Sequence, residues 1–60
     1  MEVVVYDIFL ADEEMTHVAV TKNEGKADAL VRALEDCGAE AFVLHRTVSE
    51  SLPWVKELTD

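Results

Sequence analysis

The sequence predicts an α+β fold: a small ββαβ(α) domain in which a three-stranded sheet of order 2-1-3 carries one long helix on one face and a short C-terminal helix. Three observations predict it. Two runs rich in β-branched residues, 2–10 and 15–21, indicate strands, a stretch with helical spacing follows, and a third apolar run covers 41–46. The chain has 60 residues, so we expect one domain spanning 1–60.

The first expected strand is apolar on both of its alternating faces, which predicts that both faces of the sheet are covered. The acidic segment 11–14 is expected to form a turn, after which the second strand returns antiparallel to the first. A register that pairs residue 8 with 16, 6 with 18 and 4 with 20 keeps the apolar even-numbered faces together. In that register Asp7 lies opposite His17.

The most distinct local signal is a helix that begins after the second strand. Thr21 and Glu24 fit a capping box, and Asn23 is an alternative N-cap. Gly38 is placed to end the helix in the left-handed conformation. The buried stripe expected at helical spacing consists of Ala27, Leu30, Val31, Leu34 and Cys37. This helix would connect the second strand to a third strand that runs parallel to it and docks beside the first.

In the third strand, Phe42 and Leu44 are expected to share the even-numbered face on which the long helix packs. Val43 and His45 would then lie on the other face. Pro53 follows a serine-containing segment, an arrangement typical of a helix start, and it predicts about two helical turns in the tail.

The sheet face that the long helix leaves uncovered is expected to be apolar as well. A monomer seldom leaves such a surface in water, so either the C-terminal helix or a second copy of the chain should cover it. A 60-residue chain with one cysteine has no disulfide to stabilise it, which favours self-association as a homodimer. The residues expected on this face are Val3, Val5, Phe9, Met15, Ala19 and Val43.

Three polar residues would share that face: Asp7, His17 and His45. Two histidines and a carboxylate form a known open metal site, so these residues are candidates for a metal or small-ligand site. No ligand-spacing motif supports a metal, and a half-buried Asp–His hydrogen bond is the simpler interpretation. The sequence has no nucleophile elbow, phosphate loop or dinucleotide fingerprint. We therefore expect no catalytic residues, no cofactor and no enzymatic activity.

The charge balance limits the kinds of partner that the chain can bind. Thirteen acidic residues against five basic ones give a formal net charge of −8. Because Lys and Arg neutralise phosphates, direct binding to nucleic acid is disfavoured. No run approaches the ~18 apolar residues of a membrane span, which predicts a soluble protein with no membrane partner. One free thiol and the lack of a signal peptide predict a cytoplasmic location.

Acidic side chains gather in the expected turn and along the expected helix, and apolar residues of the tail could serve as anchors. The candidate partner-binding residues are Asp12, Glu13, Glu14, Asp28, Glu35, Asp36, Trp54 and Leu58. Such charge often serves only solubility. However, acids in the last turn of a helix oppose its dipole, which indicates that they are kept for another purpose. In composition the chain resembles the small acidic proteins that phages and other mobile elements use to occupy basic surfaces of host enzymes.

We therefore hypothesise a non-enzymatic, homodimeric protein-binding module that inhibits or regulates a partner by occupying its basic, nucleic-acid-binding surface. Two alternatives remain open at this point. One is a metal- or small-ligand-sensing module that uses Asp7, His17 and His45. The other is a structural accessory subunit with no independent activity.

Overall fold

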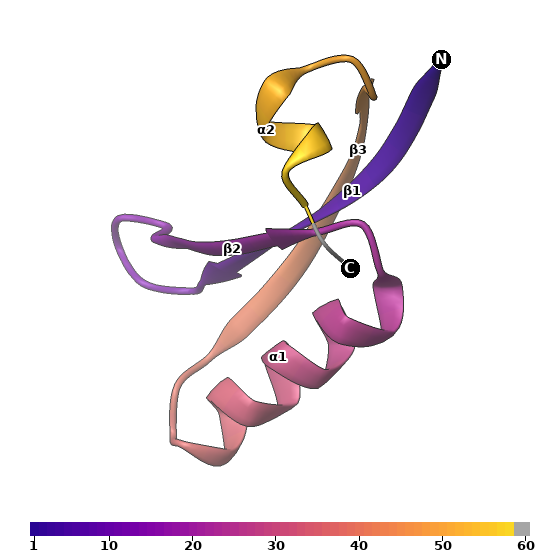
Figure 1. The fold of residues 1–60 in the computed structure, drawn as a ribbon. Helices are drawn as coiled ribbons and strands as arrows, with labels where there is room; N and C mark the ends of the chain where they lie inside the picture. The colour runs from indigo at the N-terminus through magenta and orange to yellow at the C-terminus, as the bar shows by residue number, and fades with distance from the viewer. Residues whose placement is uncertain (59–60) are drawn as a thin grey trace.

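A computed structural model describes residues 1–58 of the chain and confirms the predicted fold class and strand order. A three-stranded sheet of order β2-β1-β3 packs against one long helix, and a short helix lies near the C-terminus (Figure 1). The elements are β1 (Glu2–Leu10), β2 (His17–Thr21), α1 (Glu24–Asp36), β3 (Ala41–Ser49) and α2 (Pro53–Lys56).

The central strand β1 pairs antiparallel with both of its neighbours. Strands β2 and β3 therefore run in the same direction, and α1 is the crossover between them, as predicted. The β1–β3 ladder is regular from Glu2 opposite Ser49 to Leu10 opposite Ala41. As a result β3 is three residues longer than the predicted run 41–46, because its extra residues find partners at the start of β1.

The predicted register between β1 and β2 is wrong. Tyr6 pairs with Thr21 and Ile8 with Ala19, and a bulge follows before Phe9 pairs with His17. The loop that connects β1 to β2 is longer than the predicted turn 11–14, and hydrogen bonds stabilise its conformation. The backbone N–H of residue 10 donates to the carbonyl of residue 16 over 2.8 Å, and residue 15 adopts a positive φ of 54°. Met15 thus lies in this loop and β2 begins at His17.

The predicted faces of β3 are also wrong. Val43 pairs with Ile8 and Phe42 with Phe9, so Val43 and His45 lie on the sheet face covered by α1. Ala19, opposite Ile8, lies on the same face. Side chains alternate along a strand, and a shift of one residue in the preceding connection exchanges the two faces. Nothing local in the sequence sets that shift.

Both predicted ends of the long helix are found, with one choice now decided. Asn23 is the N-cap: its Oδ1 accepts the backbone N–H of Lys26 over 3.0 Å. The hydroxyl of Thr21 accepts the N–H of Asn23 instead of capping the helix. Gly38 has a φ of 91°, the left-handed conformation expected after the helix. Helix α2 is shorter than predicted, with four residues instead of about two turns.

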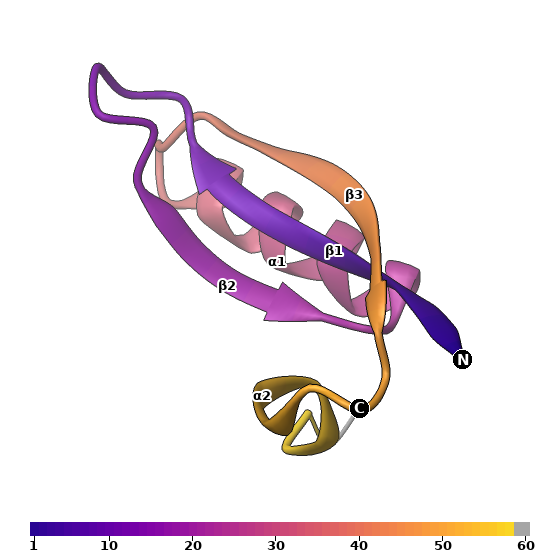
Figure 2. The same cartoon turned by 90° about the horizontal axis from the view of Figure 1, so that it is seen from above.

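The apolar core lies on both sides of β1. Ile8 and Ala27 are fully buried where α1 covers the sheet, and Val5 and Val55 are buried on the other side. Figure 2 shows α1 behind the sheet, with α2 displaced toward the end where β1 begins. We call the two surfaces the α1 face and the opposite face. The opposite face carries Val3, Val5, Asp7 and Phe9 of β1 with Phe42, Leu44, Arg46 and Val48 of β3.

Candidate functional site

Helix α2 covers only part of the opposite face. Val55 is 2% exposed, and Trp54 lies over the guanidinium of Arg46, 5.2 Å from carbon to ring centroid. Both contacts are near the start of β1, where Val5 pairs with Arg46. Helix α2 therefore lies over the Arg46 part of the opposite face and does not reach its other end. Near the end of β1 the rings of Phe9 and Phe42 stack at 5.6 Å, and Leu44 is 52% exposed.

Asp7 is a buried polar residue at the centre of this face. Its carboxylate is bound by the side chains of Arg46 and His17. Its Oδ2 accepts the Nε–H of Arg46 over 2.8 Å, and its Oδ1 lies 3.0 Å from Nε2 of His17. Burial alone would raise the pKa of Asp7, but the hydrogen bonds and charges of Arg46 and His17 together lower the pKa below its usual range. The carboxylate therefore stays ionised and is a poor general base.

The predicted Asp7–His17 contact is confirmed, although the register behind it is not the predicted one. The bulge returns His17 to the opposite face, where its ring also meets the edge of Phe9 at 5.1 Å. His45 is on the α1 face, and its ring lies 6.4 Å from that of Tyr6. Asp7, His17 and His45 line one hollow, but the two histidines belong to different faces of the sheet and the three side chains are not grouped to bind one metal ion. Within residues 1–58 no three His, Cys, Asp or Glu side chains are grouped to hold a metal ion.

Sequence reasoning missed Arg46, which occupies the place expected for His45. A signal was present. A carboxylate in a central strand that is apolar on both faces needs a cation, and Arg46 is the only Lys or Arg of the third strand. An open hollow of about 540 Å³ lies beside this ion pair, lined by Asp7, Phe9, His17, Leu44, His45 and Arg46.

Six of the 13 acidic residues gather at one end of the molecule. The backbone N–H of Ala11 donates to the carbonyl of Glu40 over 2.9 Å, which joins the β1–β2 loop to the segment after α1. Both views show that loop and the α1–β3 connection at the same end (Figures 1 and 2). We call this region the acidic end. It comprises Asp12, Glu13, Glu14, Glu35, Asp36 and Glu40, all of them exposed.

Asp28, the remaining predicted binding residue of the helix, lies away from the acidic end. It precedes Asp36 by eight residues, or about 12 Å along a helix. In the part of the chain that the structure describes, the ion pairs join Asp7 to His17 and to Arg46. The carboxylates of the acidic end are thus not neutralised by Lys or Arg from the described residues.

Asp12 differs from the rest of the acidic end because it has a structural role. Its Oδ1 accepts the backbone N–H groups of Glu14 and Thr16, each over 3.1 Å, and its Oδ2 accepts the Thr16 hydroxyl over 2.9 Å. The hydroxyl and backbone bonds from Thr16 lower the pKa of Asp12, and Glu14 adds to the effect. The carboxylate of Asp12 therefore serves first to shape the loop.

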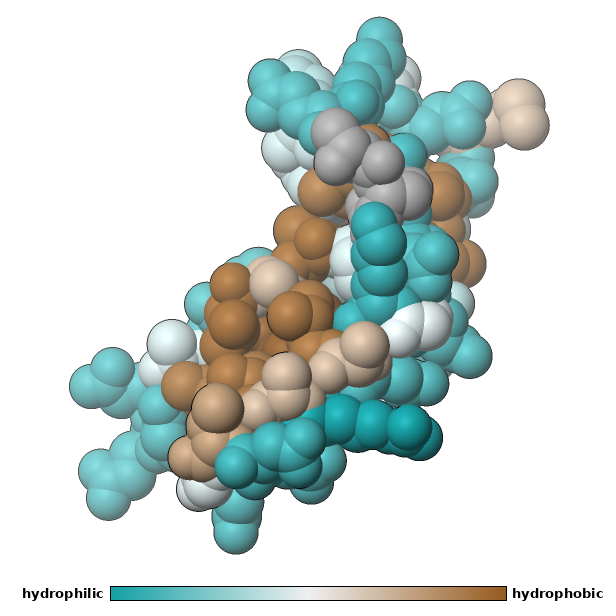
Figure 3. Space-filling view, turned by 60° about the horizontal axis from the view of Figure 1, so that its bottom comes forward, coloured by the Kyte–Doolittle hydropathy of each residue, from teal (hydrophilic) through white to brown (hydrophobic). Residues whose placement is uncertain are grey.

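The predicted tail anchors are less accessible than the apolar residues of the sheet. Trp54 and Leu58 are half-buried, whereas Leu44 is more than half exposed. On the side of α1, apolar surface runs through the middle of the molecule between hydrophilic ends (Figure 3), and the large exposed apolar side chains include Val18 and Leu30. Apolar contact surface is thus provided by the sheet and α1 more than by the tail.

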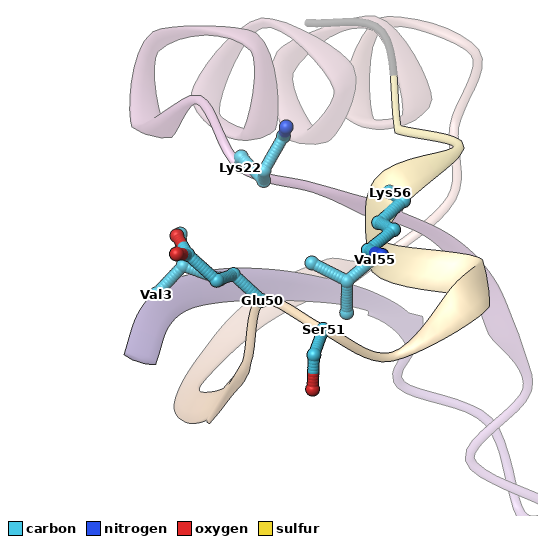
Figure 4. Close-up of a pocket in the computed structure, with 6 residues that line it drawn as sticks. All are labelled: Val3, Lys22, Glu50, Ser51, Val55 and Lys56. Atoms are coloured by element: carbon cyan, nitrogen blue, oxygen red, sulfur yellow. The ribbon is translucent and has the colours of Figure 1, made fainter. Parts of the chain in front are cut away.

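A second hollow, of about 520 Å³, lies between α2 and the start of the sheet (Figure 4). Its lining residues are Val3, Lys22, Glu50, Ser51, Val55 and Lys56. Two lysines and one glutamate surround an apolar floor here, so this end of the molecule differs in charge from the acidic end.

No known protein family, curated protein or solved structure matches this chain. Neither helix among residues 1–58 has the length and apolar character needed to cross a membrane.

Proposed function

We propose that this chain is a non-enzymatic binding module that docks its acidic end and the adjoining apolar residues onto a basic surface of a partner protein. One observation carries the proposal: the fold gathers six exposed carboxylates at one end, without a Lys or Arg partner among residues 1–58. Like charges held together raise the free energy of the free protein, and a basic partner removes that cost.

The apolar component lies at the same end. The stacked rings of Phe9 and Phe42 and the exposed Leu44 lie within four residues of the acidic end along β1 and β3. In protein interfaces such aromatic and aliphatic groups provide most of the affinity, while charges around them steer the encounter and select the partner. This arrangement supports binding to a protein more than to a small ligand.

Surfaces that bind nucleic acid are strongly basic, since their Lys and Arg side chains neutralise phosphates. An acidic module seated on such a surface would exclude the nucleic acid by competing for the same Lys and Arg side chains. We therefore propose that the module regulates or inhibits a nucleic-acid-binding protein.

The test uses two variants of equal net charge. The first neutralises four residues of the acidic end (Glu13→Gln, Glu14→Gln, Glu35→Gln and Asp36→Asn), and Asp12 is kept because it shapes the loop. The matched control neutralises four acids elsewhere (Glu2→Gln, Asp28→Asn, Glu50→Gln and Glu57→Gln). Each variant is immobilised, and the protein captured from the source lysate by the unmodified chain is purified and titrated against both.

We expect the acidic-end variant to lose at least about tenfold in affinity and the control to lose much less. Only the substitutions at the acidic end remove contacts with the basic partner. Affinity should also fall steeply as salt rises from about 50 to 500 mM, since screening weakens the attraction of exposed charges. Equal losses of affinity in the two variants would show that only the net charge matters. If neither variant changed the affinity for the partner, the proposal would be rejected.

A further inference from the structure

The two edges of the sheet differ in how well they are protected against pairing with another strand. Strand β2 has five residues and adjoins a bulge, two features by which proteins blunt an exposed edge. Strand β3 has nine residues, no proline and an uninterrupted register with β1. Of the described elements, none lies along the outer side of β3 in Figure 2.

Two hydrogen bonds identify the backbone groups that β3 leaves unpaired. Glu50 donates its N–H to the carbonyl of Met1 over 3.1 Å, and the carbonyl of Glu40 accepts from Ala11. In an antiparallel ladder, residues whose N–H and C=O point to the partner alternate with residues whose groups point away. Even-numbered residues of β3 therefore face β1. The outward-pointing residues are Ala41, Val43, His45, Thr47 and Ser49.

We propose that β3 is a self-association edge, at which a second copy of this chain adds its own β3 antiparallel to form one six-stranded sheet. Backbone pairing requires a strand of matching length with a matching row of donors and acceptors. An antiparallel copy of β3 provides that row by symmetry, since a two-fold axis places the outward-pointing residues of one copy opposite those of the other.

The charge distribution favours a second copy over the basic partner as the occupant of this edge. Although the chain has 13 acidic residues, none lies in β3, which carries Arg46 and His45 instead. A basic partner would meet Arg46 here, whereas its attraction is to the acidic end. The two-fold axis also places the acidic ends of the two copies at opposite ends of the dimer, where repulsion between them is smallest.

Self-association would also add stability that a chain of this size gains only marginally from its own core. Among residues 1–58 only Val5, Ile8, Ala27 and Val55 are apolar and buried, and domains this small commonly gain stability by oligomerising. Pairing through β3 leaves the acidic end of each copy free. The inference goes beyond the proposed function, because the outer edge of β3 is a different surface from the acidic end.

The decisive measurement is residue-resolved amide hydrogen exchange on the full chain, from low micromolar to millimolar concentration, with sedimentation velocity at each concentration. We expect dimer formation to slow exchange at Val43, His45 and Thr47 by about tenfold or more, because these amides point outward in the monomer. Leu44 and Arg46 are the internal controls. Their amides face β1 and should be protected at every concentration.

A pair of variants tests the same edge. Thr47→Pro removes one outward N–H without removing a β1–β3 hydrogen bond, so it should weaken the dimer by about tenfold or more. Thr47→Val keeps the N–H and should dimerise like the unmodified chain. Raising the salt concentration should strengthen the dimer, because screening reduces repulsion between two chains of net charge −8. Partner binding at the acidic end has the opposite salt dependence, so the two proposals can fail independently.

Four outcomes would overturn self-association through β3. The chain could sediment as a monomer at about 1 mM, a concentration at which even weak specific complexes form. It could dimerise without slowing exchange at the outward amides, which would place the interface on a sheet face. The Thr47→Pro variant could fold and dimerise unchanged. Finally, the outward amides could become protected only when the captured partner is added.

Discussion

The two faces of the sheet are closed in different ways. The α1 face is covered by a 13-residue helix with a cap at each end, and Ile8 of β1 and Ala27 of the helix are fully buried between them. The opposite face has a four-residue helix over one half and an Asp7–Arg46 ion pair at its centre. Its other half exposes apolar side chains such as Leu44. Local sequence signals thus produce the face that α1 covers, whereas the face that depends on distant residues stays partly open.

Truncation under α1 should have the largest effect on stability. Ile8→Ala removes a side chain that is 0% exposed, and such substitutions cost about 2–5 kcal/mol in the free energy of unfolding. In a chain this small we expect largely unfolded protein, measured by circular dichroism and chemical denaturation. Ile8→Val is the control and should lose about 0.5–1.5 kcal/mol. If Ile8→Ala were as stable as its control, α1 would not form the main core.

Truncation of the side chain that α2 buries should cost less. Val55→Ala removes two buried methyl groups, or about 1.6 kcal/mol at 0.8 kcal/mol for each. The matched control is Val4→Ala, the same chemical change at a position that is 40% exposed, where the loss should be under about 1 kcal/mol. Equal losses in denaturant titrations would mean that α2 does not cover the opposite face.

The C-terminal end of α1 can be destabilised without changing a buried side chain. At Gly38 the φ of 91° is unfavourable for other residues, and an added Cβ would meet nothing within 4 Å. Gly38→Ala should therefore destabilise by about 1–2 kcal/mol through the backbone alone. Gly38→Asn should cost less, because asparagine tolerates this conformation. Thermal melts of the three proteins would show this order, and an alanine variant as stable as glycine would contradict it.

Replacement of Arg46 is the most informative change on the opposite face, because its effect appears in the pH dependence of stability. Arg46 and His17 hold the folded-state pKa of Asp7 below its unfolded value, so Asp7 adds stability that is present above an unfolded pKa of about 3.9 and is lost as pH falls through the folded pKa. In Arg46→Gln, burial is less opposed and the pKa of Asp7 rises. The loss of stability should then begin at higher pH.

The measurement is the free energy of unfolding from pH 7 to pH 2, together with NMR titration of the Asp7 carboxyl carbon. Arg46→Lys keeps a positive charge and should show a smaller displacement than Arg46→Gln. If the free energy of unfolding fell with decreasing pH in the same way in all three proteins, Arg46 would not control the protonation of Asp7.

The sequence was sufficient for the features that depend on neighbouring residues. Apolar spacing predicts α1, Gly38 predicts its end, and the two-sided apolar run predicts β1 as the central strand. Register is different because it depends on loop geometry. The Asp12 hydrogen bonds lengthen the β1–β2 loop, and the α1–β3 connection determines which side chains of β3 face α1.

Those two connections determine the composition of the candidate site. They place Arg46 beside Asp7 and move His45 to the other side of the sheet. The clustering of acids follows from the same topology: residues 12–14 and 35–40 are distant in sequence, and only the pairing of β1 with β3 brings them to one end.

The order in which the strands leave the ribosome has a consequence for how the protein folds. The central strand is synthesised first, but its ladder with β3 pairs Glu2 with Ser49. Residue 49 must therefore be synthesised before the longest ladder can close completely, and β1 stays without that partner until then. Contacts so distant in sequence slow folding and leave an apolar strand open to wrong pairing in the meantime. The nascent chain should consequently depend on chaperones or on rapid completion of synthesis more than its small size suggests.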